Sequence, residues 1–201
     1  MTRRRIRTEP ITETESGHLT EFLYDDYEND GVLVCAAHGG RVEPGTAELA
    51  VELAARHPDA TCWATFGFDD EVGAYERWHP PSKSFDPDEY PLLSVIADRG
   101  FESVLSVHGL GDDEVLVGGR VDRAVKAAVA DRLDAALSTP ARPVSDGDYG
   151  GTHPENFVNW LAADGAGLQV ELGETARGSE AEAVLEVLVD VLRDGQVMPE
   201  R

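Results

Sequence analysis

Residues 31–50 of the chain are GVLVCAAHGGRVEPGTAELA. The apolar run at residues 31–37 is short and is followed by a glycine pair, which predicts a buried strand. Pro44 and Thr46 then mark a helix start, and good helix formers continue over residues 47–56. A buried strand that leads directly into a helix is typical of folds in which strands and helices alternate.

The alternation continues along the chain of 201 residues, a length that fits one domain. Expected strands lie at residues 31–37, 60–66, 102–107, 115–117 and 167–172, expected helices at 18–26, 47–56, 88–99, 122–137, 155–163 and 179–193, and long loops at 67–87 and 139–151. This order predicts an α/β fold, a three-layer sandwich with a mixed, largely parallel sheet and helices on both faces. Residues 1–30 are expected to form a polar, irregular lead-in with a short helix, and residues 31–201 a single domain.

The charge balance is strongly acidic. Lys and Arg number 17 and Asp and Glu number 39, so the formal net charge is −22. The acidic residues are spread along the chain, which indicates a solvated acidic surface of the kind found in halophilic proteins. Nucleic acid is not an expected partner, because phosphate contacts need clustered Lys and Arg. A membrane is not expected either, because no apolar run approaches the roughly 20 residues of a membrane helix.

The cysteines indicate a reducing compartment. Cys35 and Cys62 both lie in apolar, strand-like runs, which is typical of buried free thiols. The arginine cluster at residues 3–7 is not followed by an apolar segment, so neither a secretory nor a twin-arginine signal is complete. The cytoplasm is therefore the expected location, and the sequence indicates no particular oligomeric state.

Three expected strand ends carry residues suited to catalysis. His38 and His108 each follow a strand, Glu171 lies near the end of another, and Glu43 shares a loop with His38. The carboxyl ends of parallel strands meet at one edge of a sheet, so these side chains can converge. Two histidines and one glutamate are the three protein ligands of a catalytic zinc site with an open fourth position. Bound zinc lowers the pKa of its water to about 7, and Glu171 is the expected general base.

Each of these residues also has a purely structural interpretation. A single histidine at a strand end is commonly hydrogen-bonded within a core or a loop. Glu43 is a favourable anion just before a helix start, and Glu171 is suited to an exposed edge strand. Their expected convergence at one sheet edge favours the metal site over these separate interpretations.

Six sequence segments carry a family resemblance. They are AAHGGRVEPGTAELA (36–50), WHPPSKSFDP (78–87), SVHG (106–109), VLVGGR (115–120), HPENFVNW (153–160) and GLQVELGETAR (167–177). Over residues 31–193 the chain resembles the poly-γ-glutamate hydrolase family in the order of these segments. The resemblance implies a zinc carboxypeptidase-like fold and a hydrolase-type catalytic domain that cleaves γ-glutamyl amide bonds.

The resemblance also implies roles for individual residues. Zn²⁺ would be bound by His38, Glu43 and His108, Glu171 would be the general base, and Arg177 would pair with a substrate carboxylate. Substrate-binding positions of the family are matched by His79, Asn156 and Asn159. His79 is equally suited to cap a loop, and the two asparagines to satisfy loop and helix-start backbone groups.

Trp160 departs from the family pattern, because a basic residue is expected at this position. This difference indicates a less acidic substrate or a different binding register. The resemblance predicts a zinc-dependent amidohydrolase acting on an acidic, peptide-like or polyglutamate substrate. Two alternatives stay open: a metal-dependent deacylase with another acyl substrate, and a non-catalytic metal-binding homologue.

Overall fold

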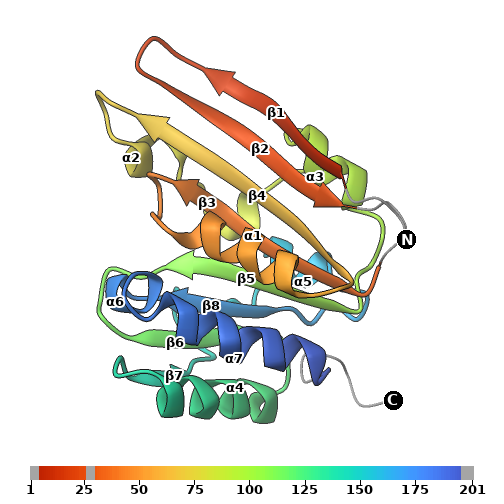
Figure 1. The fold of residues 1–201 in the computed structure, drawn as a ribbon. Helices are drawn as coiled ribbons and strands as arrows, with labels where there is room; N and C mark the ends of the chain where they lie inside the picture. The colour runs from red at the N-terminus through yellow and green to blue at the C-terminus, as the bar shows by residue number, and fades with distance from the viewer. Residues whose placement is uncertain (1–4, 26–29, 196–201) are drawn as a thin grey trace.

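The computed structural model describes residues 5–25 and 30–195 (Figure 1). Its strands are β1 Arg5–Glu13, β2 Gly17–Asp25, β3 Val32–Gly40, β4 Ala60–Asp69, β5 Ser103–Gly109, β6 Val115–Gly119, β7 Ala141–Pro143 and β8 Leu168–Leu172. Its helices are α1 Thr46–Arg56, α2 Ala74–Trp78, α3 Pro91–Ile96, α4 Arg123–Ala136, α5 Phe157–Trp160, α6 Glu174–Arg177 and α7 Ala181–Arg193, with a 3-10 turn, η1, at Ser82–Ser84.

Within these described residues the strands form one 8-stranded sheet in the order β1-β2-β4-β3-β5-β8-β6-β7. The neighbouring pairs β4 and β3, β3 and β5, and β5 and β8 are parallel, and so is the outer pair β6 and β7. The other three pairs are antiparallel, so the sheet is mixed, as predicted. Because the central strands run the same way, their carboxyl ends lie along one edge, on the left of Figure 1.

The centre of the sheet is buried on both faces, which explains the continuous apolar run of β3. Its residues Val32, Val34 and Ala36 join one hydrophobic cluster, and Leu33, Cys35 and Ala37 join the other. A strand covered on both faces has no polar positions to alternate with apolar ones. Cys35 and Cys62 are free and buried, as expected, and burial raises the pKa of both thiols.

Helices cover both faces of the sheet and complete the three layers. The first cluster lies between the sheet and α1, α4 and α7, and the second lies between the sheet and α3 and α5. In Figure 1, α1 and α7 cross in front of the sheet. The expected α/β three-layer sandwich is therefore confirmed, although α3 and α5 are shorter than the predicted helices over 88–99 and 155–163.

The amino-terminal prediction is wrong for the described residues. In place of an irregular lead-in with a helix at 18–26, β1 and β2 form an antiparallel hairpin, and β2 pairs with β4 in the main sheet. Residues 1–4 and 26–29 lie outside the described residues. The polar composition of β1 reflects its position as an edge strand, where every side chain is half-buried or exposed.

Candidate metal centre

The three expected metal ligands lie together at the carboxyl ends of β3 and β5. His38 lies near the end of β3 and His108 near the end of β5, while Glu43 lies in the turn between β3 and α1. Gly39 permits α1 to pack closely against the end of β3, because a Cβ atom there would lie 2.3 Å from the Cβ of Ala47. The backbone N–H of Glu43 donates to the carbonyl of His38 at 2.7 Å, which brings the two side chains to the same side of the turn.

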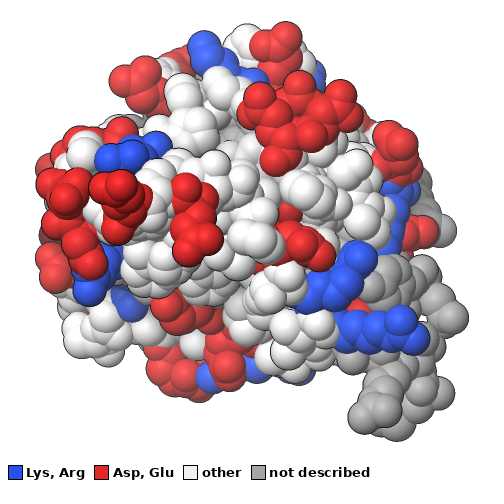
Figure 2. All heavy atoms as spheres, turned by 90° about the horizontal axis from the view of Figure 1, so that it is seen from above, with Lys and Arg blue, Asp and Glu red and all other residues white. Residues whose placement is uncertain are grey.

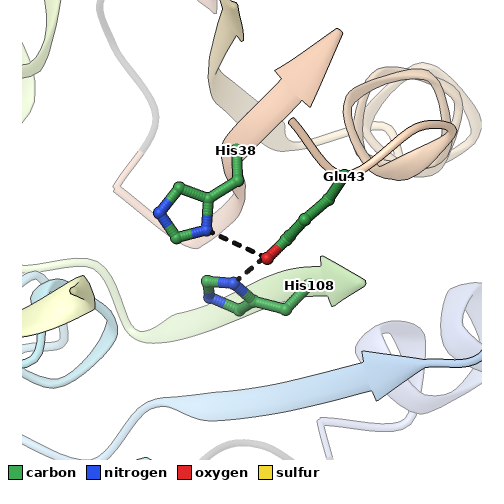
Figure 3. A group of neighbouring side chains, drawn as sticks. All are labelled: His38, Glu43 and His108. Atoms are coloured by element: carbon green, nitrogen blue, oxygen red, sulfur yellow. Dashed lines mark ion pairs between the residues drawn. The ribbon is translucent and has the colours of Figure 1, made fainter. Parts of the chain in front are cut away.

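The ligand atoms face one another across a small, buried space. Nδ1 of His38 lies 3.2 Å from Oε1 of Glu43, and Nδ1 of His108 lies 3.6 Å from Oε2 of Glu43. Figure 3 shows both imidazole rings directed at the carboxylate. One ligand atom from each residue lies within 4.8 Å of the others, and all three residues are buried. This is the set of three protein ligands that leaves a catalytic zinc ion an open position.

The hydrogen bonding of His38 fits a bound cation. Its Nε2 atom lies 2.9 Å from the carbonyl oxygen of Pro80, which can only accept, so the ring carries its hydrogen on Nε2. Nδ1 then presents a lone pair to the Glu43 carboxylate, and within the described residues this buried atom has no hydrogen-bond partner. A lone pair that faces an anion at this distance is stabilised by a positive charge between them, supplied by a proton or a metal ion, and a histidine held by a backbone carbonyl is a common form of metal ligand.

The charges of the site are strongly coupled. Burial opposes the charge of Glu43, but the three surrounding histidines outweigh it and hold the pKa of its carboxyl far below the usual range. Burial disfavours the charged form of the His38 ring as well, and for a histidine this lowers the pKa. It acts in the same direction on His108, but the carboxylates of Glu171 and Glu43 raise the pKa of that ring to about 9. The two carboxylates therefore favour a positive charge at this site, either a proton on His108 or a divalent cation that takes its place.

Glu171, the expected general base, lies beside the ligand set. It is opposite His108 in the parallel pairing of β5 and β8, and it is buried. The side chain of Gln169 donates to Oε1 of Glu171 at 2.6 Å. Burial raises the pKa of the Glu171 carboxyl, an effect that the charge of His108 opposes. A carboxyl whose pKa is shifted toward neutrality is suited to proton transfer.

His79 joins the same cluster from the segment after α2. Its Nε2 atom lies 3.0 Å from Oε1 of Glu43, and its ring stacks on Tyr75 at a centroid distance of 4.1 Å. The other carboxylate oxygen of Glu43 accepts from the backbone N–H of Gly109 at 2.8 Å. The predicted role of His79 in substrate binding stays a prediction, and its observed contact is with Glu43, an expected metal ligand.

Arg177 lies at the end of α6 and links three segments. Its Nε, Nη1 and Nη2 atoms donate to the carbonyls of Leu172, Pro44 and Leu110 at 2.9, 2.6 and 3.4 Å. These bonds place the guanidinium next to the turn that carries Glu43. Its predicted pairing with a substrate carboxylate stays a prediction.

The two asparagines are buried and bonded to the protein. The side-chain oxygen of Asn156 accepts from the backbone N–H of Val158, at the start of α5, at 3.2 Å. The amide of Asn159 donates to the carbonyls of Gly151 and His153, both at 2.8 Å, and its oxygen accepts from the N–H of Gly167. These contacts match the structural alternative considered from the sequence, and direct substrate contact stays a prediction.

Ser106 was not singled out from the sequence, although its hydroxyl lies 3.0 Å from Nε2 of His108. It precedes His108 by two residues on the same strand. Residues two apart on a strand face the same side of the sheet, so this spacing could have identified Ser106 from the sequence. Tyr75, which stacks on His79, left no comparable signal.

Trp160 lines a hollow of about 450 Å³, together with residues 83–87, Pro154 and Glu155. Phe85, one of its lining residues, lies 5.8 Å from the His38 ring between centroids. The position that departs from the family pattern therefore lines a hollow whose Phe85 wall lies against His38, and Trp160 itself is outside the expected ligand set.

The fold and site define a class. A metallo-carboxypeptidase from Burkholderia cenocepacia superposes on 94% of this chain and 65% of its own with a TM-score of 0.53 at 12% identity, a likeness of fold. The chain therefore has a zinc carboxypeptidase-like α/β fold, with two histidines and a glutamate grouped at the strand ends.

The family is narrower than this class. Residues 11–181 match the model of the poly-gamma-glutamate hydrolase family, and the chain belongs to that family. A bacteriophage poly-gamma-glutamate hydrolase superposes with a TM-score of 0.65 at 19% identity, over 95% of this chain and 87% of that chain. A zinc-free apo structure of YNDL has a TM-score of 0.68 at 25% identity, over 94% and 90% of the two chains.

Among curated relatives, the SPbeta prophage-derived UPF0714 protein YoqZ of Bacillus subtilis (strain 168) is 29% identical over 173 residues, which are 84% of this chain. The matched part is only 58% of that relative, so this chain spans little more than half of its length. Among the described helices, none has the length and apolar character needed to span a membrane.

Proposed function

We propose that this chain is a zinc-dependent amidohydrolase that cleaves γ-glutamyl amide bonds. In this proposal His38, Glu43 and His108 bind the metal, and Glu171 is the general base. The observation that carries it is the meeting of three buried ligand atoms within 4.8 Å, with Glu171 opposite His108 on the neighbouring strand. Membership of the poly-gamma-glutamate hydrolase family supports the choice of bond.

In this proposal each group of the site has a separate role in the reaction. Zinc, when bound, supplies a Lewis acid that polarises a carbonyl and makes a water molecule a nucleophile near neutral pH. Glu171 accepts a proton from the attacking water, and the same carboxyl can then deliver it to the departing amine. Gly109 and His79 hold the Glu43 carboxylate in place from both of its oxygens.

The net charge of the protein opposes the binding of the proposed substrate, which is a polyanion. A net charge of −22 repels a polyanion at low ionic strength. Arg41 does not offset this, because it pairs with Asp70 at 2.7 Å. Salt screens such repulsion, so we propose that hydrolysis of an anionic polymer is faster at high ionic strength. The free, buried cysteines support a cytoplasmic location.

The test combines metal content and turnover. Purified protein should contain about one zinc per chain, as expected of a site with one complete set of three ligands, and His38→Ala should lose it. Glu171→Gln should keep the zinc and lose about 100-fold or more in kcat on poly-γ-glutamate. Zinc binding without cleavage of γ-linked or α-linked glutamate oligomers would favour the deacylase, to be tested on N-acyl amino acids.

The non-catalytic alternative makes a different prediction. A degenerate homologue would bind zinc but show the same negligible turnover in the wild type and in Glu171→Gln. The presence of Glu171 beside the ligand set favours the enzyme over this alternative. A chain that neither contains zinc nor takes it up would contradict the proposal as a whole.

A further inference from the structure

Three buried side chains form a hydrogen-bonded chain that ends at Glu171. Nδ2 of Asn156 donates to Oε1 of Gln169 at 3.1 Å, and Nε2 of Gln169 donates to Oε1 of Glu171 at 2.6 Å. All three residues are buried, with exposed fractions of 6%, 3% and 6%. Gln169 and Glu171 are two residues apart on β8 and therefore face the same side of the sheet.

The backbone sets the direction of every bond in this chain. The N–H of Val158 can only donate, so the Asn156 atom that faces it must be the oxygen. The amide nitrogen of Asn156 is then directed at Gln169, whose oxygen must accept. The remaining nitrogen of Gln169 faces Glu171 and can only donate. A backbone group at the start of α5 thus determines which group is presented to the carboxylate.

Packing prevents Gln169 from moving away. A Cβ atom on Gly151 would lie 2.9 Å from Oε1 of Gln169, so the loop backbone lies directly against the amide. Asn159 anchors that loop by donating to the carbonyl of Gly151. The amide of Gln169 is therefore held between the loop, Asn156 and the carboxylate.

We propose that Asn156 and Gln169 are positioning residues for the general base, and that they reserve Oε1 of Glu171 as a hydrogen-bond acceptor and leave Oε2 to take the proton from water. This inference rests on the proposed function, because it assumes that Glu171 is the base. In this inference Asn156 acts by orienting Gln169, and it does not contact the substrate.

The substitution Asn156→Asp reverses the chain with almost no change of shape. One oxygen of the new carboxylate still accepts from Val158, but the other can no longer donate to Gln169. The Gln169 amide is then expected to rotate, so that its nitrogen faces residue 156 and its oxygen faces Glu171. An acceptor beside Oε1 opposes the ionised carboxylate and favours a proton there, where it cannot assist the reaction.

The experiment measures orientation and turnover in the full chain. In the wild type, nuclear Overhauser contacts should connect the Gln169 amide protons with Glu171, and in Asn156→Asp they should shift to residue 156. This measurement uses the metal-free and zinc-loaded protein and needs no substrate. With poly-γ-glutamate, Asn156→Asp should lower kcat about 10- to 100-fold while KM and the zinc Kd stay unchanged.

Thr152→Asp is the matched control, because it adds the same charge to an exposed position in the preceding segment. It should leave both the amide contacts and kcat unchanged. If Asn156→Asp does not fold, Gln169→Leu replaces it and should lower kcat with KM and zinc Kd unchanged. The inference is overturned if Asn156→Asp keeps the wild-type amide contacts or the wild-type kcat. It is also overturned if the loss of kcat in Asn156→Asp is no larger than the loss in Thr152→Asp. A wild type that cleaves no γ-glutamyl bond would refute the proposed function, while the amide contacts would still decide the orientation of Gln169.

Discussion

Nε2 of His79 and Oε1 of Glu43 lie 3.0 Å apart, and the same carboxylate oxygen lies 3.2 Å from Nδ1 of His38. His79 thus contacts Glu43, a proposed metal ligand, from the outer side of the cluster, where its ring is 27% exposed and stacks on Tyr75. Groups that hydrogen-bond to a metal ligand fix its orientation and contribute to metal affinity.

Replacing His79 should therefore weaken zinc binding. His79→Ala removes one support of the Glu43 carboxylate, and the expected loss of zinc affinity is about 10- to 100-fold. Competition with a fluorescent chelator measures this change. His153→Ala is the control, because that ring is 54% exposed and faces Glu155. Equal zinc affinity in both variants would contradict a supporting role for His79.

Zinc should raise the thermal stability of the protein. Free zinc at 100 times its Kd adds about 2.7 kcal/mol to the free energy of unfolding, which corresponds to roughly 5–10 °C in a domain of this size. Scanning calorimetry of the metal-free protein with and without zinc measures the shift. His108→Ala should not respond, because it removes one of the three ligands. Magnesium should also have no effect, since it prefers oxygen ligands. An equal shift in His108→Ala would place the bound zinc elsewhere.

The grouping of His38, Glu43 and His108 could be predicted because its signals are local. The apolar run of β3 and the helix start at Thr46 fix the turn that carries Glu43, and His108 follows a second strand of the same kind. The contact of His79 with Glu43 joins residues 36 positions apart in a region predicted as a loop. Such contacts depend on the path of the segment after α2, which no periodic pattern records.

The hairpin was missed for a different physical reason. In β2 the buried positions are Leu19, Glu21, Leu23 and Asp25, so two of its inward side chains are carboxylates. Strand alternation is recognised from apolar residues on one face, and these acids interrupt it. They are tolerated because each is bonded within the fold. Asp25, for example, pairs with Arg99 at 2.6 Å.

Glu21 should be a major contributor to stability. Its carboxylate accepts from Nε1 of Trp63 at 2.7 Å and from the backbone N–H groups of Leu92 and Leu93, at the start of α3, at 2.8 and 2.9 Å. Glu21→Ala leaves three donors unsatisfied, and each buried one costs about 1–3 kcal/mol. We expect a loss of at least about 3 kcal/mol in urea unfolding. Glu9→Ala, on the exposed strand opposite, should change stability by less than about 0.5 kcal/mol. Similar losses in both variants would contradict this assignment.

Glu180 should make stability depend on pH in the acidic range. Its carboxylate accepts from the hydroxyl of Ser138 and from the backbone N–H groups of Ser138 and Thr139, which holds the pKa of Glu180 at about 2. Because this pKa is below the ordinary 4.5, its contribution is complete above about pH 4.5 and disappears as pH falls toward 2. The melting temperature of Glu180→Gln should lie below that of the wild type at pH 7, and the gap should narrow over that window. A gap independent of pH would contradict the prediction. Glu186→Gln, on α7, which Glu180 immediately precedes, controls for the lost charge.

The acidic surface should make the fold more stable in salt. Figure 2 shows Asp and Glu side chains spread over one face of the molecule, with fewer Lys and Arg between them, in keeping with a net charge of −22. Self-repulsion of this surface falls as the screening length decreases from about 10 Å at 0.1 M salt to about 3 Å at 1 M. The melting temperature of the metal-free protein should therefore rise with potassium chloride, most steeply below about 1 M, where screening changes most. Sucrose, which acts by exclusion from the protein surface, should instead give a gradual rise without this early saturation. A melting temperature that does not increase with chloride would show that the repulsion is already balanced within the fold.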